Sequence, residues 1–288
     1  MSLQSQGLRI AGVDFRFDGV APETLFAPFS SFAAPIEEPD GRYEIRHGVP
    51  RALDAAPRFE SPIWRLHDSP GGARFEFFVD LESRDQPVMT AEVSRDWSRG
   101  ALTLDPMRVP ARTLGAPVSS PFGELALMSL ISPRGLYVHA SAALGPNGVD
   151  VFLGKSGAGK TTLAGIARAS GAAILSDDRT VLRVEDGRLF AYGTPFHGTG
   201  RHWSCQSGPV RGLYFLEQSM ASGLTRMPHA LAAARLASFC FTKFWDRAEV
   251  ERALEFCGVH TASVPSYVLR FRPDATALAT IEAGAHAP

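Results

Sequence analysis

The feature that most constrains this chain is the stretch GKSGAGKT, Gly154 to Thr161. It fits the pattern G-x-x-x-x-G-K-[ST], with the apolar run VDVFL before it and the helix-forming run TLAGIARAS after it. Glycines in such a loop let successive backbone N–H groups turn toward one anion, and the start of the helix adds the positive end of its dipole. The stretch therefore predicts a strand, a phosphate-binding loop and a helix in that order, which is an α/β arrangement.

Within this loop, two side chains carry specific chemistry. Lys160 places a point charge beside the terminal phosphates, and the Thr161 hydroxyl is a ligand of the kind that Mg²⁺ takes in phosphate-binding loops. ATP and Mg²⁺ are therefore the expected cofactors. The residues expected to surround the nucleotide phosphates are Gly154, Lys155, Ser156, Gly157, Ala158, Gly159, Lys160, Thr161 and Thr162.

Two adjacent aspartates, Asp177 and Asp178, follow the next short strand, AAIL. The strand comes directly after the helix of the loop, so both carboxylates are expected beside the γ-phosphate. One carboxylate can hold Mg²⁺, and the other can accept the proton of an attacking hydroxyl. The alternative is a helix cap or an exposed turn with no chemical role.

His139 lies in the apolar run YVHASAAL, just before the strand that leads into the loop. A histidine on an apolar strand is commonly a satisfied core residue. Next to the loop, however, it can pair with an aspartate and hold its orientation or its proton. Both interpretations are open from the residues alone.

The chain is long enough for two unequal domains. Residues 1–116 read as short segments with period-two alternation broken by proline and glycine, which predicts a strand-rich subdomain that recognises a substrate or partner. A hairpin with its turn at 68–72 is expected there. Residues 117–288 are expected to form the domain that carries the phosphate-binding loop, with strands joined at 145–148 and a hairpin turning at Asp186-Gly187.

The C-terminal third predicts helices over 228–241 and 246–258 and a last strand from Ser266. Lys243 stands among aromatic residues, which indicates either core or a peptide groove. The polar, glycine-rich segment 192–204 is either a surface loop or a mobile loop that closes over substrate. In the second case, the side chains that would reach phosphate are His197, Arg201 and His202.

Composition excludes some function classes. With 29 basic and 30 acidic residues, a broad electrostatic surface for nucleic acid or anionic lipid is not expected. The three cysteines show neither a disulfide framework nor a zinc pattern. Without a signal-like start or a long apolar run, we expect a cytoplasmic protein with neither nucleic-acid nor membrane partners.

The motifs together carry a family resemblance. The sequence VHASAAL…GVDVFLGKSGAGKTTLA…GAAILSDD resembles the catalytic core of bacterial HPr kinase/phosphorylase and its diverged relatives, and PVRGLYF is similar to that family's later E-I-R-G-L-G-I signature. The resemblance covers about residues 135–216. It implies an α/β fold with a P-loop core of the HPr kinase and phosphoenolpyruvate carboxykinase type, a mixed sheet, and phosphoryl transfer as the reaction.

Carried over position by position, the resemblance implies an ATP- and Mg²⁺-dependent kinase acting on a serine or similar hydroxyl of a protein or peptide. Asp177 is then the base that activates the hydroxyl, supported by His139, and Asp178 joins Thr161 at the metal. Arg211, with Lys160, binds phosphate or the phosphorylated product. Family members often form oligomers, so a homo-oligomer is also implied.

Some positions depart from the family pattern. Pro209 replaces the glutamate of the signature, which puts the reverse phosphorylase reaction in doubt, and Thr162 stands where HPr kinases usually have glutamate. The first hundred residues resemble instead the strand-rich leader of HPr-kinase-related proteins encoded near small biosynthetic clusters, some of which phosphorylate a precursor peptide. The rival hypotheses are a small-metabolite kinase and a non-catalytic nucleotide-binding module.

Overall fold

The computed structural model describes residues 4–20, 27–78, 86–105, 107–108, 121–132 and 134–285. The chain divides into two compact units, Met1–Leu130 and Ile131–Pro288. Each unit is built on one mixed sheet, so the predicted α/β class with a mixed sheet is confirmed. The expected boundary between residues 116 and 117 falls outside the described ranges, and helix α3 (Phe122–Ile131) belongs almost wholly to the first unit.

The N-terminal unit is an eight-stranded sheet with the order β1-β2-β3-β8-β7-β6-β5-β4. β3 pairs in parallel with both of its neighbours, β2 and β8, and the other described pairs of this sheet are antiparallel. Its strands are β1 (Gln4–Ile10), β2 (Val13–Val20), β3 (Gly41–His47), β4 (Phe59–Glu60), β5 (Trp64–Ser69), β6 (Gly72–Phe77), β7 (Met89–Ser94) and β8 (Arg99–Leu104), with the short helix α1 (Ala27–Ser30) between β2 and β3. The hairpin predicted at 68–72 is confirmed by β5 and β6.

Aromatic side chains hold this unit together. The ring of Phe122, on α3, packs edge-on against Tyr43 and Phe77, with centroids 5.1 and 6.4 Å apart. The buried Tyr43 hydroxyl donates to the backbone oxygen of Trp97 at 2.7 Å, which removes the cost of burying it. The period-two alternation of the sequence thus buries one aromatic face of the sheet under α3.

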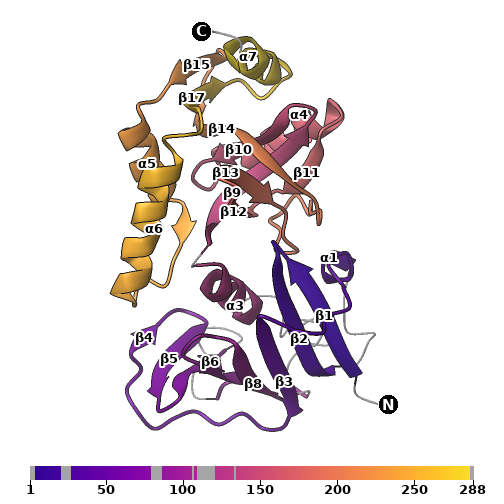
Figure 1. The fold of residues 1–288 in the computed structure, drawn as a ribbon, viewed down its shortest axis with the longest axis vertical. Helices are drawn as coiled ribbons and strands as arrows, with labels where there is room; N and C mark the ends of the chain where they lie inside the picture. The colour runs from indigo at the N-terminus through magenta and orange to yellow at the C-terminus, as the bar shows by residue number, and fades with distance from the viewer. Residues whose placement is uncertain are drawn as a thin grey trace. The chain divides into compact units, whose positions relative to one another are not determined.

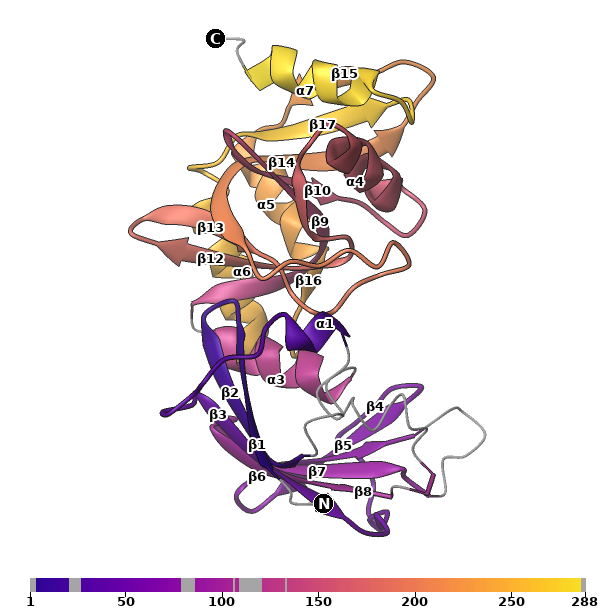
Figure 2. The ribbon, with the colours of Figure 1, turned by 90° about the vertical axis from the view of Figure 1, so that its right-hand side faces the viewer.

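The C-terminal unit contains a nine-stranded sheet ordered β10-β9-β12-β13-β14-β17-β15, with β11 and β16 joined to β9 and a further pairing of β10 with β14. The strands are β9 (Gly135–Gly145), β10 (Gly148–Leu153), β11 (Ala173–Ser176), β12 (Arg179–Glu185), β13 (Arg188–Tyr192), β14 (Ser207–Gln218), β15 (Gly223–Arg226), β16 (Cys240–Phe241) and β17 (Ser266–Phe271). The helices are α4 (Lys160–Ala169), α5 (His229–Ala237), α6 (Arg247–His260) and α7 (Thr276–Ala285). The hairpin of β12 and β13 extends away from the helices of this unit (Figure 2).

Helices cover both faces of this second sheet. Val149, Val151 and Leu153 of β10 pack in a core cluster with residues of α5 and α6, whereas Phe152 packs in a second cluster with residues of α4 and α7. Figure 1 shows α5 and α6 side by side, with α4 on the opposite side of the strands. Among the helices of the described ranges, none combines the length and the apolar character needed to cross a bilayer.

Strand β9 changes partners along its length. Its first part, through His139, pairs with β12, and from Ala140 onward it pairs with β10. β16 adds to the first part of β9 and β11 to the second. His139 therefore lies where the strand leaves one set of neighbours for the other, next to the end of β10 from which the glycine-rich loop starts.

Several local predictions are confirmed, and one is wrong. The turn at Asp186-Gly187 has φ angles of 48° and 76°, as a two-residue hairpin turn requires. The helix expected over 228–241 ends at Ala237, because Cys240 and Phe241 leave it to form β16 against β9. Pairing with a distant strand outweighs the helical spacing of the sequence there. The helix α7 was not predicted.

The cysteines are free thiols. Cys240 and Cys257, on β16 and α6, have their sulfur atoms 3.8 Å apart. The hydrogen bond between them and burial raise the pKa of the Cys240 thiol, so this thiol stays protonated. The absence of a disulfide framework in the sequence prediction agrees with this arrangement.

Candidate functional site

A polar cavity of about 390 Å³ lies where the glycine-rich loop passes into α4. Five separate segments of the C-terminal unit form its wall. They are the loop and first turn of α4 (Ser156, Gly157, Gly159, Lys160, Thr161 and Thr162), His139, Asp178, the pair Gly198 and Thr199, and Gln218.

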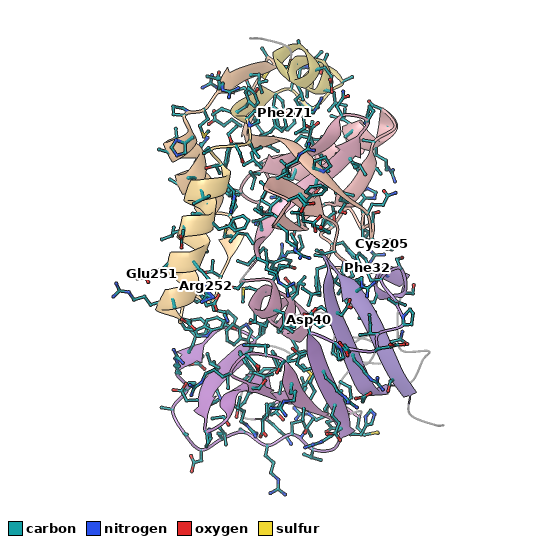
Figure 3. All side chains as sticks on the ribbon, viewed as in Figure 1. Phe32, Asp40, Cys205, Glu251, Arg252 and Phe271 are labelled. Carbon is teal, nitrogen blue, oxygen red and sulfur yellow. The ribbon has the colours of Figure 1, made fainter. Side chains whose placement is uncertain are left out.

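The loop has backbone angles that favour glycine. Gly157 and Gly159 have φ angles of 79° and 100°. A Cβ on Gly159 would lie 2.5 Å from the ring of Phe271, which is labelled at the end of β17 in Figure 3. Glycine is required at this position for both conformation and space. The predicted Gly154 and Ala158 shape the loop without lining the cavity, since a Cβ on Gly154 would lie 2.7 Å from that of Ala158.

Lys160 is the first residue of α4, and its side chain turns back into the loop. Its Nζ donates to the carbonyl oxygens of Gly154 and Lys155 at 2.7 and 3.3 Å. The side chain is buried, and burial lowers the pKa of the lysine, with Asp178 acting in the opposite direction and Arg179 in the same one. The lysine charge is thus held beside the cavity by the loop itself.

Gln218, at the end of β14, closes the loop from the other side. Its Nε2 donates to the carbonyl oxygen of Gly157 at 2.7 Å, and the side chain also lines the cavity. β14 pairs in parallel with β10, so the ends of the two strands lie next to each other. Sequence reasoning missed Gln218, and only the parallel pairing of two apolar runs could have indicated it.

Asp178 faces the cavity, and two side chains contact its carboxylate. His139 Nε2 lies 2.9 Å from Asp178 Oδ1, and the guanidinium of Arg179 contacts Oδ2. Residues 139 and 179 are direct partners in the β9–β12 ladder, which sets this geometry. The structure therefore brings the predicted His139 and Asp178 together.

The environment keeps Asp178 ionised. Burial raises the pKa of its carboxyl, but the hydrogen bond from His139 and the charges of Arg179, His139 and Lys160 together bring the pKa below its ordinary value. A carboxyl with a lowered pKa is a weak base and a persistent negative charge at neutral pH. This suits electrostatic work or metal contact better than proton transfer.

Asp177 has a different environment from its neighbour. Its side chain is only 1% exposed, and its Oδ1 accepts a hydrogen bond from the backbone N–H of Gly198 at 2.9 Å. Its Oδ2 is buried with no hydrogen-bond partner among the described residues. An unpartnered buried carboxylate oxygen is costly, which marks it as a candidate for a chemical role.

The segment Gly198–Gly200 covers the two aspartates. A Cβ on Gly200 would lie 2.4 Å from Asp177 Oδ2, and one on Gly198 would lie 2.8 Å from the Cβ of Asp178. This segment therefore lies against Asp177, which is not among the residues that line the cavity. The sequence left two interpretations open here, a surface loop or a mobile loop whose side chains reach phosphate. In the structure, His197 instead stacks on Trp203 at 5.2 Å, and among the described residues lining the cavity there is no His197, Arg201 or His202.

Arg211 is not brought to the cavity. Its guanidinium binds the carboxylates of Asp150 and, at 2.8 Å, of Glu282. The bond to Asp150 contributes most to raising the pKa of the arginine, and the charge of Asp150 and the bond to Glu282 act in the same direction. The ladder between β10 and β14 shifts register here, so that Asp150 pairs with Gly212, at the opposite end of β10 from the loop. Arg211 therefore ties α7 to the sheet.

Two other predicted positions resolve into structural roles or plain exposure. Lys243 is buried and pairs with Glu249 at 3.0 Å, which is the core alternative. Lys155 is exposed, and its backbone rather than its side chain takes part in the loop. Phe241, which the sequence placed in a helix, lies against His139 and Arg179 and was missed as a site residue.

These elements define a class of site: a polar cavity at the N-terminal end of a helix, with a buried lysine and an ionised aspartate facing each other across it. Among the described residues, no group of three or more histidine, cysteine or acidic side chains is arranged to hold a metal by itself. No protein-family model matches this sequence, and no curated protein is significantly similar to it.

Proposed function

We propose that this chain is an ATP- and Mg²⁺-dependent kinase that transfers the γ-phosphate to a serine or similar hydroxyl of a protein or peptide. One observation carries the proposal: a single cavity joins the N-terminal end of α4, Lys160 and Asp178, with the unpartnered oxygen of Asp177 beside it. The order β10, loop, α4, β11 and paired aspartates supports a P-loop core of the HPr kinase and phosphoenolpyruvate carboxykinase type.

The loop supplies the phosphate site in this proposal. Backbone N–H groups at the start of α4 and the helix dipole favour an anion there. An ammonium group has three donors, and Lys160 uses two of them on loop carbonyls, which leaves one for a phosphate oxygen. Phosphate binding thus gives a partner to the third donor of an ammonium group that is already buried in the folded protein.

The residues present fit a magnesium ion. The Thr161 hydroxyl and the Asp178 carboxylate both line the cavity and are oxygen ligands. Mg²⁺ commonly uses one or two protein oxygens and completes its shell with phosphates and water, so the absence of a larger cluster among the described residues fits this mode. When bound, the ion neutralises charge on the β- and γ-phosphates.

Asp177 accepts the proton in this proposal. The oxygen of the substrate hydroxyl attacks the γ-phosphorus while the bond from that phosphorus to the β-phosphate oxygen breaks. The hydroxyl proton passes to Asp177 Oδ2, and ADP leaves. Since Gly200 lies against Oδ2, the segment Gly198–Gly200 moves aside when the acceptor hydroxyl enters. Asp178, held ionised by His139 and Arg179, contributes charge and metal contact rather than proton transfer.

The proposed acceptor is a peptide, such as the precursor peptide of a biosynthetic cluster that the family resemblance implies, with the N-terminal sheet as its recognition element. We place the reaction in the cytoplasm, where ATP is available and thiols stay reduced, as the free cysteines fit. A homo-oligomer belongs to the same proposal. None of these narrower points is needed for the chemistry above.

The test is a transfer assay with labelled ATP and Mg²⁺, comparing serine-containing peptides with a panel of small hydroxyl metabolites. We expect a phosphopeptide product, located on serine by mass spectrometry. Asp177→Asn removes the proton acceptor at constant side-chain size, so transfer falls by about 100- to 10,000-fold while nucleotide binding persists.

Asp186→Asn is the matched control, because Asp186 is exposed in a turn whose positive φ asparagine tolerates, and we expect wild-type transfer from it. Product on metabolites alone identifies a metabolite kinase. Nucleotide binding without transfer to any acceptor identifies a binding module, and either result overturns the peptide-kinase proposal.

A further inference from the structure

The ring of Phe241 lies against both side chains that hold Asp178. The Cζ atom of Arg179 lies 4.4 Å from its centroid, and the His139 ring stacks on it with centroids 6.0 Å apart and an interplanar angle of 30°. His139 and Arg179 bind opposite oxygens of the same carboxylate. One aromatic side chain therefore contacts both His139 and Arg179, the two side chains that bind the Asp178 carboxylate.

Phe241 comes from a distant part of the chain. It lies on β16, a two-residue strand that pairs Cys240 with Val138 and Phe241 with Tyr137. The backbone N–H of His139 donates to the carbonyl oxygen of Phe239 at 2.8 Å, so the same segment fixes the histidine backbone as well as its ring. The strand thus delivers an aromatic ring to the place where β9 changes partners.

The contact has a physical effect on Arg179 and His139. A guanidinium over an aromatic face is attracted to the ring, more strongly as water is excluded. Arg179 and Asp178 side chains are 24% and 23% exposed, so this attraction acts in a partly desolvated place. Stacking also restricts the rotation of the His139 ring and thereby fixes which way its Nε2 points.

We infer that Phe241 is a positioning residue that fixes the Asp178 carboxylate through His139 and Arg179. This inference rests on the proposed function, in which Asp178 contacts the metal of the nucleotide. Without the ring, both side chains gain rotational freedom, and the orientation of the carboxylate that they hold toward the cavity is less well fixed. The expected loss is in metal affinity rather than in the affinity for nucleotide alone.

The test compares Phe241→Leu, which keeps an apolar side chain but removes the ring, with Phe241→Tyr, which keeps the ring. The probe is Mn²⁺ binding to the full-length protein, followed by electron paramagnetic resonance in the presence of a non-hydrolysable ATP analogue. We expect the leucine variant to bind Mn²⁺ about 3- to 10-fold more weakly. The tyrosine variant restores wild-type affinity, and metal-free binding of the analogue is equal in all three proteins.

Phe244→Leu is the matched control, because Phe244 is a nearby aromatic residue that is 63% exposed. It is expected to bind Mn²⁺ as the wild type does. Unchanged Mn²⁺ affinity in Phe241→Leu overturns the inference, as does an equal loss in the tyrosine variant. Thermal unfolding establishes whether each variant is folded. If the leucine variant does not fold, Mn²⁺ binding by Phe241→Tyr and the Arg179 resonance described next test the inference.

A second readout needs no nucleotide. The ring current of Phe241 shifts the Nε–H proton resonance of Arg179 upfield in the wild type, and we expect this shift to be lost in Phe241→Leu and kept in Phe241→Tyr. If the wild type binds no nucleotide, the proposed function fails, and this resonance alone decides whether Phe241 positions the cluster. An Arg179 resonance without ring-current shift in the wild type overturns the inference.

Discussion

Two glycine-bearing segments wall the cavity, and they are held in different ways. In the loop at 154–159, polar groups are bound from within and from β14, by Lys160 on two carbonyls and by Gln218 on a third. The segment Gly198–Gly200 is joined to the aspartates by the hydrogen bond from Gly198 N–H to Asp177 and by the close approach of Gly200. Among the described residues, its Gly198 carbonyl is bonded only within the segment's own turn, by the backbone N–H of Arg201 at 3.3 Å and to His197 Nδ1 at 2.9 Å.

This difference indicates that the loop at 154–159 serves binding and that the segment Gly198–Gly200 serves movement. A loop whose carbonyls are already bound presents its N–H groups without further ordering, which is what preorganised phosphate binding needs. The segment Gly198–Gly200 leaves Asp177 Oδ2 buried without a hydrogen-bond partner among the described residues, which is unfavourable. Moving the segment aside exposes this oxygen to water or to a substrate hydroxyl. The first wall is expected to stay in place during turnover, and the second to open.

The largest expected effect comes from breaking the first wall with Lys160→Met. Loss of a charged hydrogen bond to phosphate weakens MgATP binding by roughly 10- to 150-fold. Isothermal titration calorimetry measures the affinity. Lys155→Met, at an exposed position five residues earlier in the same loop, should bind as the wild type does. Equal losses in both variants would show that the loop's overall charge, rather than the buried lysine, binds the nucleotide.

The second wall is tested by Gly200→Ala. The added methyl has no room beside Asp177, so the segment must shift, at a cost of about 1–3 kcal/mol of unfolding free energy. Urea unfolding measures it, and hydrogen exchange at 198–201 should become faster. Gly165→Ala, within α4 and with nothing near its Cβ, should instead stabilise by roughly 0.5–1 kcal/mol. A Gly200 variant as stable as wild type contradicts the close packing of this wall.

Gln218→Ala sharpens the comparison with a smaller effect. The Gly157 carbonyl loses its donor, which at about 0.5–1.5 kcal/mol lowers MgATP affinity by roughly 2- to 12-fold while the fold is retained. Gln206→Ala, at an exposed glutamine preceding β14, is expected to leave the affinity unchanged. If both variants bind equally well, the loop needs no support from β14.

The smallest effect is the pH dependence of stability that Lys160 brings. Burial lowers the pKa of this lysine below its model-peptide value of 10.5. In the interval between the folded pKa and 10.5, the unfolded chain binds more protons, so the unfolding free energy rises with pH. The difference between wild type and Lys160→Met should therefore shift in favour of the wild type as pH rises through this interval. Urea unfolding at several pH values measures it, and parallel curves would contradict a buried charge.

The local part of the fold and site was predictable because it depends on neighbouring residues. The pattern Gly154–Thr161, the short strand just before Asp177 and the turn at Asp186-Gly187 each follow from turn chemistry and hydrophobic spacing over a few residues. These features need no knowledge of which distant strands meet. The role of His139 was predicted only in part, because the resemblance implied that it supports Asp177, whereas the β9–β12 ladder brings it to Asp178.

The rest of the site depends on long-range pairing, which spacing does not report. Gln218 reaches the loop because β14 pairs with β10, and Phe241 reaches His139 because two residues leave an expected helix to join β9. Arg211 fits a local motif, but the register of β14 directs it to Asp150. Nothing near Gly200 in the sequence indicates that this glycine covers a buried carboxylate.

The partner change of β9 has a consequence for how the C-terminal unit is made. β9 pairs with segments that come after it in the chain, from Gly148 to Phe241. During synthesis the strand emerges early and lacks its last partner until about a hundred further residues have followed. Contacts of such sequence separation form slowly. The strand that carries His139 is therefore the natural place for a chaperone to protect the nascent chain, and for the slowest amide exchange once folding is complete.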